Sequence, residues 1–234
     1  MVLQKHTDRE YELELETLRE RVLFMGAQVE GLIETAIEAL KEMSVQTAMR
    51  AIAADSEIDD LEVEIDELGL RLLARRQPVA SDLRFITTTF KLVTDLERAG
   101  DLAVNIAERV VELTNDPHPP QLSANLWQMA QVAHAMLKDA LDAFVTEDVL
   151  KAVGVTERDS AVDAFYAQLF PELVAKMVSD TRNVVPATRL QSIGKCIERI
   201  ADHATNIAEM VIFMVRGQDV RHHHGLLRGG SGKR

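Results

Sequence analysis

Apolar side chains recur along the chain with the spacing of α-helices, in six long segments separated by turn and breaker residues. The segments run from about 7 to 43, 46 to 75, 81 to 113, 123 to 145, 147 to 179 and 186 to 215. In the third segment the apolar residues gather on one side of the helix, which we expect to face the core. These residues are Leu92, Leu96, Leu102, Ile106, Val110 and Leu113.

Proline and glycine mark several ends of these segments. Pro78 ends the second segment, and Gly217 follows the last one. The stretch "TNDPHPP" at 114–120 has the composition of a linker. Gly154 and Pro171 fall inside the fifth segment, where we expect a kink or a local break.

Two pairs of segments show that the chain contains an internal duplication. The stretches "LVTDLERAGDLAVNIAERVVEL" at 92–113 and "IGKCIERIADHATNIAEMVIFM" at 193–214 align at an offset of 101, and most of the shared positions are polar. The stretches "DSEIDDL" at 55–61 and "DSAVDAF" at 159–165 align at an offset of 104. The sequence therefore predicts an all-α protein of two tandem three-helix bundles. We expect the first bundle at 1–115, the second at 121–217 and a disordered Gly-rich tail at 218–234.

Composition and charge narrow the functional classes. The chain has 234 residues, of which 47% are hydrophobic and only 4% aromatic, which is typical of a soluble helical protein with almost no strand. A net charge of −12 argues against a nucleic-acid surface and suits a basic partner or bound cations. The single cysteine, Cys196, and the lack of a signal peptide indicate the cytoplasm. No apolar run approaches the roughly 20 residues that span a bilayer, so we expect membrane association only through partners.

Acidic and amide side chains form a stripe on the third segment, opposite its apolar side. At about 100° per residue, the four members fall within about 80° of one another. They are Glu97, Asp101, Asn105 and Glu108, and the duplication repeats them as Glu198, Asp202, Asn206 and Glu209. The preceding segment of each unit carries a pair of acids, Asp55 with Asp59 and Asp159 with Asp163.

Hairpin geometry predicts that these acids meet. Asp59 with Glu97, and Asp55 with Asp101, are both centred on Pro78 in the turn between the second and third segments. Residues at equal distances from a hairpin turn lie at the same height. The corresponding acids of the second unit are centred in "SDTRN" at 179–183. We therefore expect four carboxylates at one level in each unit.

Three explanations of these acids remain open. Carboxylates at one level repel unless a cation joins them, and all-oxygen ligands favour Mg²⁺, Ca²⁺, Mn²⁺ or oxygen-ligated iron, among which the sequence does not distinguish. Arg98 and Arg199 lie beside the stripe and could neutralise it as a salt-bridge network instead. The third explanation is a solvated acidic face. A ferritin-like di-iron enzyme would need a Glu-x-x-His motif, and the sequence has no such spacing on these segments.

Three motifs resemble those of the PhoU family, the accessory regulators of phosphate-specific transport in bacteria. They are "RRQPVASDLR" at 75–84, "ERAGDLAVNIAE" at 97–108 and "ERIADHATNIAE" at 198–209. The resemblance implies a cytosolic protein without catalytic activity. It also implies coupling of the phosphate ABC transporter, through its ATPase subunit, to the sensor kinase PhoR. The expected outcome is that the phosphate regulon stays off when phosphate is plentiful.

The resemblance also bears on the acidic stripe. Some family members bind multinuclear metal clusters with Glu/Asp-x-x-x-Asp motifs, which fall here on the two stripes. The second unit departs from the pattern, because Tyr166 and Phe170 replace Glu62 and Asp66 of the first. A metal-storage protein or a metal-dependent helical enzyme is the alternative, which turnover assays with bound iron would separate from a signalling adaptor. We also expect a homodimer, since a second copy could cover apolar stripes of two long amphipathic bundles.

Overall fold

The computed structural model describes residues 9–117 and 120–217, and every regular element in those ranges is a helix. The elements are α1 (Arg9–Glu42), α2 (Val45–Ala53), α3 (Asp55–Arg76), α4 (Ala80–Thr114), α5 (Ala124–Thr146), α6 (Val149–Ser179), the short 3₁₀ helix η1 (Thr181–Asn183) and α7 (Val184–Arg216). The predicted all-α class is confirmed. The tail for which we predict disorder, 218–234, lies outside the described residues.

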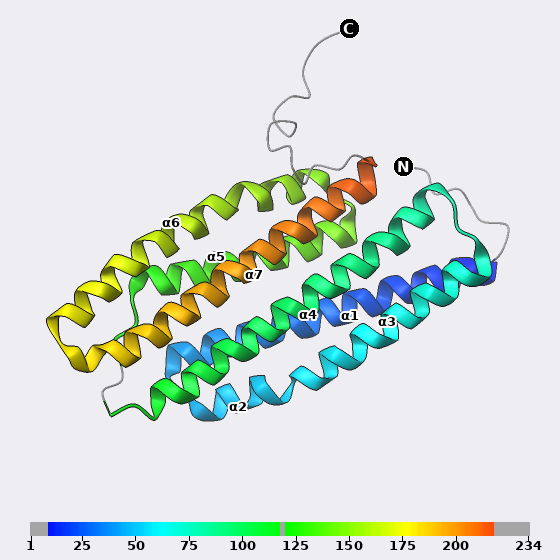
Figure 1. Cartoon of the computed structure of the whole chain (residues 1–234). Helices are drawn as coiled ribbons and strands as arrows, with labels where there is room; N and C mark the ends of the chain where they lie inside the picture. The colour runs from blue at the N-terminus through cyan, green and yellow to red at the C-terminus, as the bar shows by residue number, and fades with distance from the viewer. Residues whose placement is uncertain (1–8, 118–119, 218–234) are drawn as a thin grey trace, which may run out of the picture.

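The two halves of the chain form two elongated helical units that lie side by side (Figure 1). Helices α1 to α4 make the first unit and α5 to α7 the second, as the duplication predicts. The units meet where α4 packs along α7 and where α1 contacts α5. Their buried side chains form one continuous hydrophobic core. The six apolar residues predicted to face the core from α4 are all at most 4% exposed.

Matching turns connect the first two helices of each unit. Met43 and Glu147 follow α1 and α5 with left-handed backbone, at φ of 50° and 54°, and they are separated by the same offset of 104. The next residue caps the following helix in both cases. The Ser44 hydroxyl accepts a hydrogen bond from the N–H of Thr47, and the Asp148 carboxylate accepts from two N–H groups at the start of α6. The duplication therefore extends to the local chemistry of the turns.

The second predicted helix is divided in the structure. The N–H of Ala54 donates to the carbonyl of Ala51 at 3.1 Å, which closes α2, and α3 begins at the next residue. The prediction of a single helix from 46 to 75 was therefore wrong. At the equivalent place in the second unit, Arg158 donates to the carboxylate of Asp139 on α5 and to the carbonyl of Gly154. The helix there remains continuous.

The remaining helix boundaries follow the sequence signals, with one exception. Pro78 lies in the loop between α3 and α4. Gly217 ends α7 with left-handed backbone at φ of 69°, and its N–H donates a hydrogen bond to the carbonyl of Phe213. Helix α6, in contrast, is continuous through Gly154 and Pro171, so a local break is absent there, and a kink stays a prediction. Within the part of the chain that the structure describes, no helix combines the length and apolar character needed to cross a membrane.

Candidate metal centre

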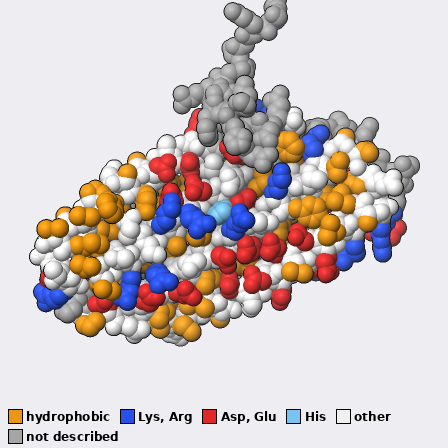
Figure 2. Space-filling model, in the orientation of Figure 1, with side chains coloured by type: hydrophobic (Ala, Val, Ile, Leu, Met, Phe, Trp, Pro, Cys, Tyr) orange, Lys and Arg blue, Asp and Glu red, His pale blue; other side chains and the backbone are white. Residues whose placement is uncertain are grey.

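Acidic side chains gather in two groups on the face of the molecule that carries α3, α4, α6 and α7. Figure 2 shows one group over α3 and α4 and a second, smaller one over α6 and α7. We call these the first and second acidic clusters. The first cluster consists of Asp55, Asp59, Glu62, Asp66, Glu97 and Asp101, and the second of Asp159, Asp163, Glu198 and Asp202.

The first cluster brings the acids of α3 against those of α4. Burial raises the pKa of Glu97 most, and the charges of Asp101, Glu62 and Asp59 raise it further, to about 7. The pKa of Asp55 is raised by burial and then by the charges of Asp59 and Asp101. The pairs that the hairpin geometry aligns, Asp59 with Glu97 and Asp55 with Asp101, are therefore close enough to repel each other.

None of the six carboxylates in the first cluster forms an ion pair with a residue in the described ranges. One oxygen of Asp66, Oδ1, is buried without a hydrogen-bond partner there, and burial raises the pKa of this group. An unpartnered buried carboxylate oxygen beside other carboxylates fits an oxygen-ligated cation, because the cation would both neutralise and coordinate it.

The side chains of the two clusters are not arranged as a closed coordination shell. Over residues 9–117 and 120–217, no three His, Cys, Asp or Glu side chains are grouped tightly enough to hold a metal ion. The donor atoms therefore fit a hard cation in chemistry and charge, and binding would require the carboxylates to rotate towards one another.

The remaining members of the first stripe contribute less to the cluster. The side-chain amide of Asn105 donates to the backbone carbonyl of Asp101 at 2.8 Å. Glu108 is exposed, and its carboxylate lies 3.9 Å from the guanidinium of Arg109. Glu108 nevertheless contributes to raising the pKa of Asp55, so it lies within electrostatic range of the cluster.

The second cluster differs from the first because it contains a cation. Burial and the charges of Glu198 and Asp159 raise the pKa of Asp202 to about 6, while the charge of Lys195 opposes this rise. The Lys195 ammonium donates to Glu198 at 2.5 Å. Asp159 accepts a hydrogen bond from the Thr205 hydroxyl at 3.2 Å.

The last two members of the second stripe have their own surroundings. The amide of Asn206 points to the other unit and donates to Asp95 of α4 at 3.1 Å. Glu209 is buried at 8% exposure, whereas its counterpart Glu108 is exposed. The two stripes match in sequence but differ in what their residues contact.

Sequence reasoning missed a polar contact between the units. His203 of α7 is buried, and its Nδ1 lies 2.6 Å from the carboxylate of Asp95 on α4. Asp95 aligns with Cys196 in the duplication, so no repeat of this pair exists to reveal it. Lys195 was also missed, although the alignment places it opposite Thr94 and so contains the signal.

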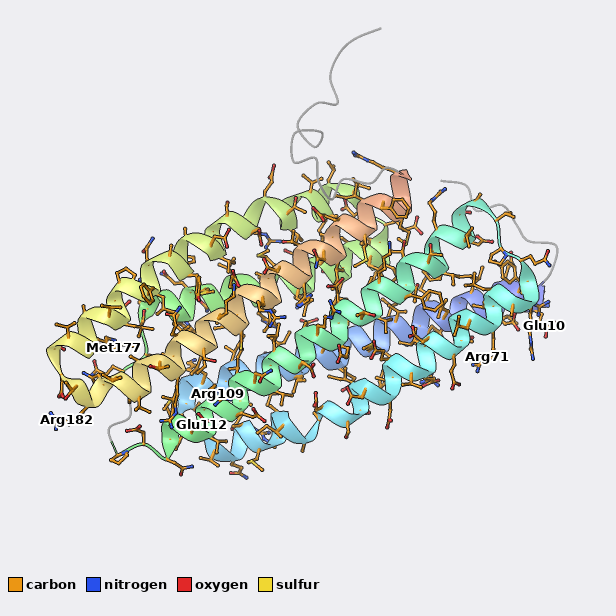
Figure 3. All side chains as sticks on the ribbon, viewed as in Figure 1. Glu10, Arg71, Arg109, Glu112, Met177 and Arg182 are labelled. Atoms are coloured by element: carbon orange, nitrogen blue, oxygen red, sulfur yellow. The ribbon has the colours of Figure 1, made fainter. Side chains whose placement is uncertain are left out.

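The two arginines that the sequence offered as a salt-bridge network, Arg98 and Arg199, do not pair with the stripes. Arg98 and Arg199 are exposed and form no ion pair with any residue that the structure describes. Arg109 and Arg189 make their shorter contacts with Glu112, although Arg109 also lies 3.9 Å from Glu108. Arg109 pairs with Glu112 on the same helix, near the end of α4 (Figure 3), and Arg189 of α7 also donates to Glu112, at 3.0 Å.

Comparison with known proteins gives consistent matches along both units. The family model described as "PhoU domain" matches residues 22–110 and again 126–211. A phosphate-specific transport system accessory protein PhoU homolog from Rhizobium meliloti is 39% identical over 212 residues, which cover 91% of this chain and 90% of that protein. The homolog of the same description from Pseudomonas aeruginosa is 39% identical over 220 residues, covering 94% and 91%.

Solved structures agree with the sequence matches. The crystal structure of PhoU from Pseudomonas aeruginosa superposes with a TM-score of 0.86 at 38% identity, covering 89% of this chain and all of that one (100%). The phosphate transport system regulatory protein PhoU from Streptococcus pneumoniae has a TM-score of 0.82 at 30% identity, covering 90% and 99%.

Proposed function

This chain belongs to the PhoU family, and on that premise we propose that it is an accessory protein of a phosphate-specific transport system. The observation that carries the proposal is the extent of the match, which includes both units and more than nine-tenths of the chain. The relatives that share this extent carry that description in their names.

The regulatory part of the proposal is that the protein couples transport to signalling. It acts in the cytoplasm, contacts the ATPase subunit of the phosphate ABC transporter and a PhoR-type sensor kinase, and represses the phosphate regulon when phosphate is plentiful. It reaches the membrane through these partners. Its role is to bind and relay, without a catalytic step of its own.

The first acidic cluster is the proposed site for a divalent cation or an iron cluster, and the second cluster is the equivalent candidate in the other unit. The candidate ligands are the acids of the two clusters, on α3 and α4 in the first unit and on α6 and α7 in the second. The remaining stripe members lie next to them: Asn105, Glu108, Asn206 and Glu209. A hard cation there would offset the repulsion between carboxylates and would tie two helices of a unit together. Mg²⁺, Mn²⁺, Ca²⁺ and oxygen-ligated iron all suit such donors.

We further propose that the protein forms a homodimer through an apolar patch where α6 and α7 meet. The patch consists of Phe170, Val174, Val178, Val184 and Val185. Three of these residues are spaced four apart on α6, so they share one face of the helix. Val178 is 81% exposed and Phe170 58% exposed, and hydrophobic side chains gather at this end of the molecule in Figure 2. Exposed apolar patches of this kind mark association surfaces.

Deleting the gene from its own host tests the regulatory proposal. We expect phosphate-starvation genes to be expressed in phosphate-rich medium, and a plasmid copy of the chain to silence them again. The transporter and kinase genes must be intact and expressed in the deletion strain, which is the control. Silent starvation genes in that strain would contradict the proposal.

A further inference from the structure

Lys195 lies at the edge of the second acidic cluster, with its side chain 51% exposed, and makes two contacts there. Its ammonium nitrogen Nζ lies 2.5 Å from Oε2 of Glu198 on the same helix, one turn away. The same nitrogen lies 5.6 Å from the centre of the Tyr166 ring on α6, within the range of a cation–π contact. Lys195 therefore lies between α6 and α7, at the level of the carboxylates.

The tyrosine that receives this ammonium is itself fixed in place. The side-chain amide of Gln191 donates to the Tyr166 hydroxyl at 2.7 Å. Gly194, beside Lys195, lets α6 approach closely, because a Cβ there would be 2.5 Å from Leu169, while the Tyr166 ring would be in ordinary contact at 3.5 Å. Gln191 of α7 thus helps to fix the ring that the Lys195 ammonium contacts.

The first unit lacks this arrangement at the equivalent positions. Thr94 aligns with Lys195, and its hydroxyl donates to the carbonyl of Phe90 at 3.1 Å. Glu62 aligns with Tyr166, so a carboxylate replaces the ring that receives the ammonium. The first cluster has six carboxylates and no cation among the described residues, a formal charge of −6, whereas the second has four carboxylates and one ammonium, −3.

We propose that Lys195 is a tethered counter-ion of the second acidic cluster, so that a divalent cation binds to the first cluster and is excluded from the second. The ammonium takes one carboxylate oxygen that a metal ion would use, and its charge repels a second cation close by. The inference rests on the proposed cation site and adds which of the duplicated clusters is used. The duplicated clusters then differ in use: the first binds a metal ion, and the second is neutralised in part by the Lys195 ammonium.

Manganese binding by the full chain tests this assignment. The amount of Mn²⁺ bound per chain is measured by equilibrium dialysis, and its affinity by the electron paramagnetic resonance signal of free Mn²⁺. We expect the double variant Glu97→Gln/Asp101→Asn to lose most of the wild-type binding. The matched variant Glu198→Gln/Asp202→Asn, which makes the same change in the second cluster, should keep it.

Replacing the lysine by its counterpart in the first unit gives the decisive variant. Lys195→Thr should bind additional Mn²⁺, with an affinity in the second cluster at least about tenfold above that of wild type, because a unit charge next to the site is removed. Adding Glu198→Gln/Asp202→Asn to this variant should return binding to the wild-type level. Lys138→Thr, on α5 and paired with Glu30, removes the same charge away from both clusters and should change nothing. Circular dichroism confirms that each variant is folded.

Two results would overturn the inference, and they differ in what they leave standing. Equal loss of Mn²⁺ from the two double variants, with no gain in Lys195→Thr, would show that both clusters bind metal. The proposed cation site would then survive without the role of Lys195. Absence of Mn²⁺ binding in both wild type and Lys195→Thr would overturn the inference and the cation site together.

Discussion

Glu97 and Glu198 show how the same residue acquires different properties in the two units. They align in the duplication, and both lie on a helix that faces other carboxylates. Glu97 is partly buried and its charged neighbours are carboxylates. Burial and these negative charges raise the pKa of Glu97 to about 7. Glu198 is bound by the ammonium of Lys195. The position three residues before each glutamate differs between the units: it is Thr94 in the first and Lys195 in the second. Only the lysine supplies a cation to its glutamate.

The raised pKa of Glu97 predicts how stability depends on pH in the absence of metal. The folded chain holds a proton on Glu97 that the unfolded chain, with the usual pKa of 4.5, releases. This contribution to stability is complete below about pH 4.5 and is lost as the pH rises through about 7. In chelator, we expect the wild-type melting temperature to fall as the pH rises from about 4.5 to about 7, and Glu97→Gln to reduce that fall.

The matched control for this experiment is Glu34→Gln, which makes the same chemical change at an exposed position of α1. It should keep the full decline of the wild type. Parallel declines of the wild type and Glu97→Gln would mean that Glu97 does not contribute to the pH dependence.

At the scale of helices, the two units follow one plan but pack differently in detail. The first unit interrupts its second helix at Ala54, whereas α6 continues through the equivalent position at Arg158. The contact of α6 with α7 depends on Gly194, since a side chain there would collide with the fully buried Leu169. Small residues at such contacts set how closely two helices approach.

A pair of glycine substitutions tests this packing. Gly194→Ala places its Cβ 2.5 Å from Leu169, and crowding a buried side chain costs about 1–3 kcal/mol, which outweighs the helix propensity gained. Gly31→Ala is the matched control on α1, where nothing lies within 4 Å of the new Cβ. It should stabilise the protein by up to about 1 kcal/mol through helix propensity. Urea denaturation measures both, and equal stabilisation by the two variants would contradict the packing account.

For the whole molecule, the arrangement of the two units determines which surfaces are left open. The units bury their apolar faces in one core where α4 packs along α7, and the apolar patch at the α6–α7 end remains outside it. Figure 2 shows the acidic clusters over the middle of the helices and hydrophobic side chains gathered at the α6–α7 end of the same face. The patch begins at Phe170, one turn of α6 from Tyr166 beside the second cluster, whereas the first cluster lies on the other unit.

Light scattering at micromolar concentration tests the proposed dimer. We expect the wild type to be dimeric, and Phe170→Ser with Val178→Ser to be monomeric, because both substitutions remove apolar area from the patch. Leu13→Ser with Leu70→Ser removes comparably exposed leucines from the first unit and should leave the dimer intact. A monomeric wild type, or a dimer unaffected by the patch substitutions, would contradict the proposal.

The sequence by itself determined the helical class, the duplication, most helix ends and the level at which the acids meet. These features depend on short-range regularities: the apolar spacing of one helix, the caps at its ends, and equal distances from a hairpin turn such as Pro78. That Asp59 lies within electrostatic range of Glu97 follows from counting residues from the turn.

Only the tertiary structure decided the contacts that depend on how helices cross. The pairing of Asp95 with His203, the burial of Glu209 and the place of Lys195 against Tyr166 depend on the relative rotation and separation of α4, α6 and α7. Apolar spacing assigns a side of a helix but not the residue that it meets on a distant one. Helix packing settles those contacts because side chains from separate segments must fit together in one core.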